Sequence, residues 1–106
     1  MSTFWPLGIR GKTVRLLNDA GFDVTTPLAS ELTTMLVMSA KRLRSQAGGK
    51  VDEWACVLAA ATILPDNDTA LPHLTKTTGV SYETAFQAMT KISYQALIKQ
   101  AELKEG

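Results

Sequence analysis

The chain has 106 residues and a net charge of +1, with 45% hydrophobic and 20% charged residues. These values are close to the globular average, exclude a disordered chain, and fit a single domain over residues 1–106 with one core. One cysteine and one histidine cannot make an internal disulfide or a cysteine/histidine zinc cluster, so we expect no metal, no other cofactor and a reducing, cytoplasmic setting.

An apolar arm is predicted over residues 1–11 at the N-terminus. Its Phe4 and Trp5 are candidate interface residues, which would dock into another subunit or cover the protein's own core. The arm lacks the basic start and apolar run of a signal peptide, so we expect no secretion. A short helix follows over residues 12–20, and Gly21 can end it in a left-handed cap.

A second helix is predicted from Pro27 to about Gln46. Thr26 and Pro27 form an N-cap and first-turn pair, hydrophobic residues then recur at helical spacing, and two glycines follow the helix. Basic residues near its end either complement the helix dipole or bind phosphate or an acidic protein surface. With three basic residues near the N-terminus they form the predicted basic patch, which consists of Arg10, Lys12, Arg15, Lys41, Arg42 and Arg44.

Residues 51–64 are predicted to form the central helix. Asp52 can cap it, and from Trp54 onward it is apolar on all sides except at Thr62, which is typical of a helix surrounded by others. We expect Cys56 within it to be buried and unreactive. The apolar stretch is too short to cross a bilayer, so we expect no insertion into a membrane.

Two further helices complete the chain. Pro65 ends the central helix, a short fourth helix ends near Thr78, and a fifth runs from Ser81 to Lys104. No alternating run of β-branched and aromatic residues is long enough for a strand. The sequence therefore predicts an all-α fold, a compact bundle of about five helices with a central apolar helix (51–64) and a long C-terminal helix (81–104).

Residues 74–89, LTKTTGVSYETAFQAM, have the order of a helix, a glycine turn and a second helix. Gly79 can take a positive φ where the first helix stops, and Ser81 can cap the second. The run Gly79-Val80-Ser81 followed by Thr84 resembles the helix-turn-helix DNA-binding proteins of bacteria and phages. The resemblance implies that the second helix enters the DNA major groove. Two packed core helices can produce the same order.

The resemblance covers residues 71–90 and implies a helix-turn-helix within residues 69–92. Gln87 is the best base reader, because its amide can pair with adenine in two places. The resemblance implies phosphate contacts for the hydroxyls of Tyr82 and Thr90 and for the ammonium groups of Lys76 and Lys91. The candidate DNA-binding residues are Lys76, Ser81, Tyr82, Glu83, Phe86, Gln87, Thr90 and Lys91.

The charge of the chain is unevenly distributed with respect to this motif. Residues 1–50 contain seven Lys/Arg and three Asp/Glu (7 − 3 = +4), whereas residues 51–106 contain four and seven (4 − 7 = −3). Affinity for DNA comes largely from neutralised phosphates. The distribution therefore weighs against DNA binding by the second half unaided.

The fifth helix is apolar on two faces beyond the motif. The outward face of Phe86 and Thr90 continues through apolar residues, and so does the opposite face. We infer that one face packs on the protein's own core and the other on a second subunit or a partner protein. If the helix breaks near Ser93, both faces could be buried within one chain. The candidate interface residues on the outward face are Tyr94, Leu97, Ile98 and Ala101.

Two functions follow from these patterns. No nucleophile, base and oxyanion donor form a recognisable catalytic set, so we expect no enzyme. The leading interpretation is a small oligomeric DNA-binding protein, such as a transcriptional regulator, whose partners are double-stranded DNA and a second copy in a dimer. The alternative is a protein-interaction module, such as an adaptor or inhibitor, which binds another protein or a second copy of the chain through the C-terminal helix and the arm. Exposure of Phe86, with basic residues beside it, is what the DNA interpretation requires.

Overall fold

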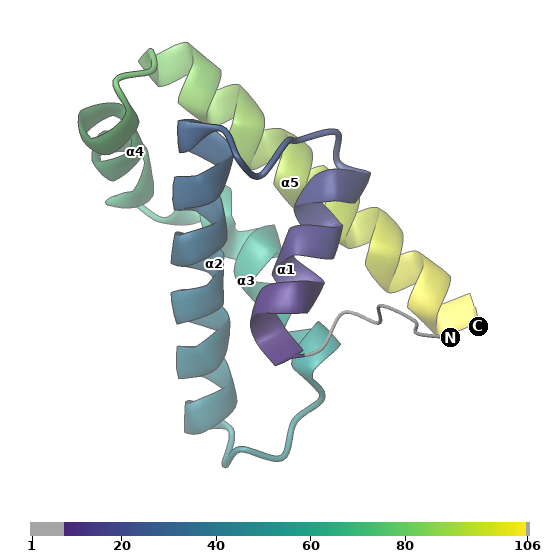
Figure 1. Cartoon of the computed structure of the whole chain (residues 1–106). Coiled ribbons are helices and arrows are strands. Elements are labelled where there is room, and N and C mark those ends of the chain that lie inside the picture. The colour runs from purple at the N-terminus through teal and green to yellow at the C-terminus, as the bar shows by residue number, and fades with distance from the viewer. Residues whose placement is uncertain (1–7, 106) are drawn as a thin grey trace.

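The computed structural model describes residues 8–105, which form helices joined by turns and contain no strand. The predicted all-α fold is confirmed. Within these residues, five α-helices and one short 3-10 helix (η1) follow one another (Figure 1). They are α1 (Gly8–Asp19), α2 (Pro27–Gln46), α3 (Glu53–Ile63), η1 (Leu64–Asp66), α4 (Ala70–Thr78) and α5 (Tyr82–Glu105).

The predicted capping residues start the helices. The Oγ1 of Thr26 accepts a hydrogen bond from the backbone N–H of Ala29 (3.4 Å) at the start of α2. At the start of α3, the carboxylate of Asp52 accepts one from the N–H of Ala55 (3.1 Å). Each cap satisfies a backbone donor that has no partner within its helix. Gly21 follows α1 in the left-handed region, as predicted.

The helix α3 is the centre of the fold, because it packs against α1, α2 and α5. Cys56 is buried in it, together with four apolar neighbours, as predicted. It is not surrounded on all sides, however, because Ala55 and Ile63 are exposed. The small residues of α3 let the flanking helices approach closely, and the buried side chains form one hydrophobic cluster.

The first helix begins earlier than its sequence pattern suggests. α1 starts at Gly8, so residues 8–11 of the predicted arm belong to a helix. Gly8 has a φ of +71°, which brings the chain into the helix, and Ile9 is buried in the core. Glycine disfavours helix interiors, and the glycines at both ends of this segment therefore made it resemble an irregular arm. The candidate interface residues Phe4 and Trp5 lie outside the described residues.

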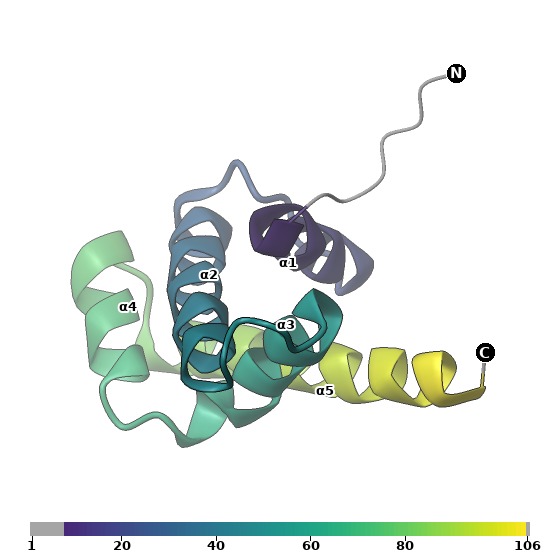
Figure 2. The same cartoon turned by 90° about the horizontal axis from the view of Figure 1, so that it is seen from below.

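The helix α5 is unbroken over 24 residues, which corresponds to about 36 Å. The predicted alternative, a break near Ser93, is therefore wrong. Ser93 lies within the helix, and its hydroxyl donates a hydrogen bond to the carbonyl of Thr62 in α3 (3.1 Å). The C-terminal end of α5 extends past the other helices (Figure 2), and Leu103 is therefore exposed although it lies on the inward face. Among the described helices, none is long and apolar enough to cross a membrane.

Candidate functional site

The helix, glycine turn and helix predicted from residues 74–89 are present in the structure. Gly79 ends α4 with a φ of +78°, and its N–H donates to the carbonyl of Thr75 (3.0 Å). The Oγ of Ser81 accepts from the N–H of Thr84 (3.1 Å) and thereby caps α5. The four residues that pack the two helices of this motif together are buried: Leu74, Ala85, Ala88 and Met89. This local structure follows from the positive φ at the glycine and from the serine cap.

The left-handed turn at Gly79 gives a first testable prediction. We expect Gly79→Ala to lower the free energy of unfolding by about 1–2 kcal/mol, because an L-residue is strained at this φ. Nothing lies within 4 Å of an added Cβ, so the cost is one of backbone conformation alone. Gly79→Asn is the control and should lose less, because asparagine tolerates this region better. Urea unfolding followed by circular dichroism measures both. Equal stability of the alanine variant and the unmodified protein would contradict the described turn.

The candidate DNA-binding residues on α5 are exposed. Phe86 is 49% exposed, and Gln87, Thr90, Tyr82 and Glu83 are exposed as well. Ser81 differs from them in that its hydroxyl is used in the cap and also donates to Thr84 Oγ1 (2.9 Å). The first three turns of α5 therefore present a continuous outward surface.

Few cations accompany this surface. Residues 69–92 contain two cations, Lys76 and Lys91, and one anion, Glu83. Two aspartates precede α4. The ammonium of Lys91 lies 5.4 Å from the ring centroid of Phe22, a cation–π contact. Both lysines are exposed, but Lys91 is held beside the Phe22 ring. The positive and negative charges around the motif nearly cancel. Such a surface has little attraction for a polyanion.

The predicted basic patch is divided among several surfaces. Arg15 pairs with Asp19 of the same helix (3.3 Å). Arg42 lines a cavity between α2 and α4, together with His73. The remaining members lie near the start of α1 and the end of α2, at the opposite end of α2 from α4 (Figure 1). The structure therefore does not combine the basic patch and the glycine-turn motif into one surface.

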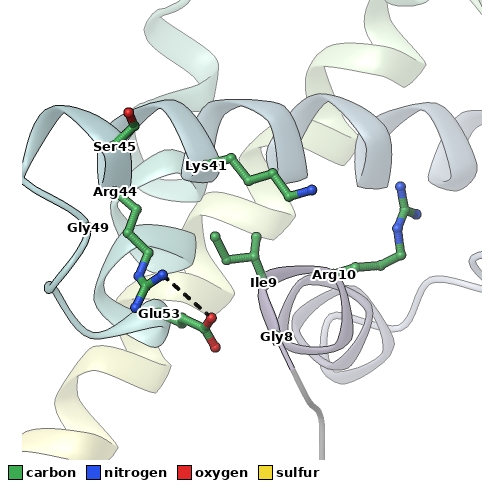
Figure 3. Close-up of a pocket in the computed structure, with 8 residues that line it drawn as sticks. All are labelled: Gly8, Ile9, Arg10, Lys41, Arg44, Ser45, Gly49 and Glu53. Carbon is green, nitrogen blue, oxygen red and sulfur yellow. Dashed lines mark ion pairs between the residues drawn. The ribbon is translucent and has the colours of Figure 1, made fainter.

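A cationic cavity of about 610 Å³ lies between the start of α1 and the end of α2. Its lining residues are Gly8, Ile9, Arg10, Lys41, Arg44, Ser45, Gly49 and Glu53. Figure 3 shows that Lys41 extends from α2 and Arg10 from α1 into the space between these helices. Glu53 lies 3.1 Å from Lys12 Nζ and 4.0 Å from Arg44 Nη1. Its contacts with Lys12 of α1 and Arg44 of α2 join residues far apart in the chain, so local sequence does not predict them.

A histidine–glutamate pair is a second feature absent from the sequence interpretation. His73 Nε2 on α4 lies 2.6 Å from Glu31 Oε2 on α2, and the two residues are 42 positions apart. They line the cavity of about 390 Å³ that also includes Arg42. No sequence signal joins them, because they meet through the packing of α4 on α2. Within residues 8–105, no three histidine, cysteine, aspartate or glutamate side chains lie close enough together to hold a metal ion.

The C-terminal half of α5 exposes large apolar side chains on its outward face. Tyr94 is 65% exposed, Leu97 49% and Ile98 36%, and Ala101 is exposed beside them. The opposite face packs on the core through the buried Ile92 and other side chains. We call the outward residues Phe86, Tyr94, Leu97, Ile98 and Ala101 the α5 apolar face. No described element of the chain covers this face.

Comparison with known proteins gives no further constraint on these surfaces, because no family model, curated protein or solved structure matches this chain.

Proposed function

We propose that this protein is a protein-interaction module and that the α5 apolar face binds a second copy of the chain. The observation that carries the proposal is the exposure of four large apolar side chains along one face of an unbroken helix. Contiguous apolar patches on soluble proteins mark interaction sites, whereas scattered single residues do not. The glycine-turn motif has only two lysines, Lys76 and Lys91, to attract a polyanion. The α5 apolar face is therefore better suited to an apolar partner than the motif is to DNA.

The spacing of the outward residues supports a helix as the partner. Tyr94, Leu97 and Ala101 of this face, with the polar Gln87 and Thr90 before them, follow one another at intervals of three and four residues, which is the spacing of a coiled-coil seam. Phe86 and Ile98 flank this strip. Residues at this spacing form one strip along a helix, which a second helix covers along its length. A second α5 carries a strip with the same length and spacing.

The charges beside the strip support an antiparallel pair. Lys91 and Glu102 lie on the same flank of α5, three turns apart, and both are exposed. In the single chain Lys91 contacts the Phe22 ring and Glu102 lies 4.0 Å from Lys99, so a pair between copies would replace or share these contacts. When Tyr94 of one copy lies opposite Leu97 of the other, Lys91 comes within roughly 3 Å along the helix axis of Glu102 in the second copy. Twofold symmetry forms this ion pair twice. In a parallel pair, Lys91 would face the uncharged Phe86.

Sedimentation velocity of the full chain tests the proposal. We expect the mass to rise from 11.5 kDa toward twice that value as the concentration increases from about 5 to 500 μM. Apolar burial drives this association, so 0.5 M salt should weaken it little. A mass that stays at 11.5 kDa throughout would overturn self-association through this face.

DNA binding is a second candidate, which the capped turn at Gly79 and the exposure of Gln87 favour. It uses the same strip as self-association. In the antiparallel pair, Lys104 of the second copy would lie over Gln87, and Ala101 over Thr90. A protein paired in this way cannot place Gln87 in a major groove. The two activities therefore exclude each other on one helix.

A gel-shift titration between about 50 and 200 mM salt tests the second candidate. If the protein reads DNA, binding should weaken steeply with salt, and Gln87→Ala should remove about 1–3 kcal/mol of discrimination at one base pair. Gln46→Ala, an exposed change at the end of α2, serves as the matched control. We expect no sequence-specific shift at any salt concentration. A specific shift lost in Gln87→Ala would support the DNA function over self-association as the role of α5.

A further inference from the structure

We propose that the cationic cavity between α1 and α2 binds the phosphate group of a small-molecule phosphate monoester. This site is separate from the α5 apolar face and does not depend on the function proposed for that face. The cavity of about 610 Å³ lies within the range of small-ligand sites.

The cavity has a net positive charge. Three cations, Arg10, Lys41 and Arg44, and one carboxylate, Glu53, line it. Lys12 pairs with Glu53 beside the cavity, so the five side chains together have a charge of +3 (4 − 1 = +3). The Glu53 carboxylate has Lys12 at 3.1 Å and Arg44 at 4.0 Å, so two cations already balance it. An anion entering the cavity therefore meets a compensated carboxylate and uncompensated cations.

Arg10 and Lys41 are the uncompensated cations. Neither forms an ion pair or hydrogen bond with another residue in the range 8–105. They come from two different helices and extend into the same space (Figure 3). Two cations that line one cavity repel each other, and a dianion bound between them would remove that repulsion and pair with both. A phosphate monoester has a charge of about −1.5 to −2 at neutral pH.

Arg44 is held in a fixed position at the wall of the cavity. Its Nε donates to the carbonyl of Val51 (3.0 Å), and its Nη1 lies 4.0 Å from Glu53 Oε2. A guanidinium has five N–H donors in a planar fork, so these contacts leave donors for a ligand oxygen. Because the side chain is already ordered, little conformational entropy is lost on binding.

The wall of the cavity has room for the organic part of such a ligand. Gly49 has a φ of +81° and no side chain, and nothing lies within 4 Å of where a Cβ would be. Ile9 contributes an apolar surface beside the cations. The start of α1 also faces the cavity through Gly8, and its first turn contains no acidic residue that would balance the positive end of the helix dipole. These features supplement the three cations and do not define the site alone.

Amide chemical-shift titration by NMR tests the proposal with phenyl phosphate as the probe, at constant ionic strength. We expect saturable shifts of the amides of Gly8, Ile9, Ser45 and Gly49, and none of this size with potassium chloride. Lys41→Gln and Arg10→Gln should each weaken binding about fivefold or more, the effect of losing one charge-assisted contact at a partly exposed site. Arg42→Gln is the matched control, because it removes a neighbouring cation of α2 that lines a different cavity.

Three results would overturn the proposal. The first is the absence of saturable shifts at these amides. The second is equal binding by the Lys41→Gln and Arg42→Gln variants, which would mean that the basic residues act only as general surface charge. The third is a shift produced by a DNA duplex but not by phenyl phosphate, since the cavity would then hold a backbone phosphodiester. The dispersion of the NMR spectrum shows directly whether each variant is folded.

Discussion

Replacing Leu97 with glutamate is expected to hold the protein as a monomer. Leu97 is 49% exposed in the single chain, and it would be buried against the Tyr94 of a second copy. Burying a leucine side chain contributes about 1.5–3 kcal/mol. The twofold axis repeats the loss, so the dissociation constant should rise at least about 100-fold. Sedimentation equilibrium measures this change directly.

The control for this prediction is Met38→Glu. Met38 is 58% exposed on α2, away from the α5 apolar face, and the change introduces the same charge in place of an apolar side chain. This variant should associate like the unmodified protein. Circular dichroism should show that both variants keep their helices, since both positions are exposed. Equal association of the Leu97→Glu and Met38→Glu variants would show that α5 is not the interface.

The core of the bundle gives the second large expected effect. Leu36 on α2 is fully buried in the hydrophobic cluster. Leu36→Ala removes three carbons from a packed interior and leaves a cavity, which should cost about 2–5 kcal/mol in the free energy of unfolding. For a domain of this size, the melting temperature should fall by more than about 10 °C. Thermal and urea unfolding measure the loss.

Met38→Ala is the matched control for this loss, because it shortens a side chain two residues away on the same helix. The exposed position should change stability by less than about 0.5 kcal/mol. A loss in Leu36→Ala no larger than in Met38→Ala would mean that α2 does not pack on α3 as described. The comparison tests the packing of α2 without depending on any function.

The helices were predictable from the sequence where a local residue sets their ends. Thr26, Asp52 and Gly79 each act within one turn of the chain, through a hydroxyl, a carboxylate or a positive φ. The burial of the inward face of α5 followed from its helical periodicity in the same way. The start of α1 at Gly8 was not predicted, because it depends on the burial of Ile9 in the core. This tertiary contact outweighs the low helix propensity of the neighbouring glycines.

The candidate sites were less predictable because they join distant parts of the chain. Basic residues close together in sequence suggested one patch, but Arg15 pairs along its own helix and Arg42 faces a different cavity. The cationic cavity requires α1 to lie beside the end of α2, and the contact of His73 with Glu31 requires α4 to lie along α2. Helical periodicity assigns residues to a face but does not say which helix covers that face.

The α5 apolar face is tested most directly by intermolecular NOEs in a sample that mixes isotope-labelled and unlabelled protein. Filtered spectra report only contacts between two copies. The proposed antiparallel pair predicts NOEs between the Tyr94 ring of one copy and the Leu97 methyl groups of the other, together with NOEs between Thr90 and Ala101. Intermolecular NOEs confined to another surface, such as that around Met38 or Ile63, would contradict self-association through α5.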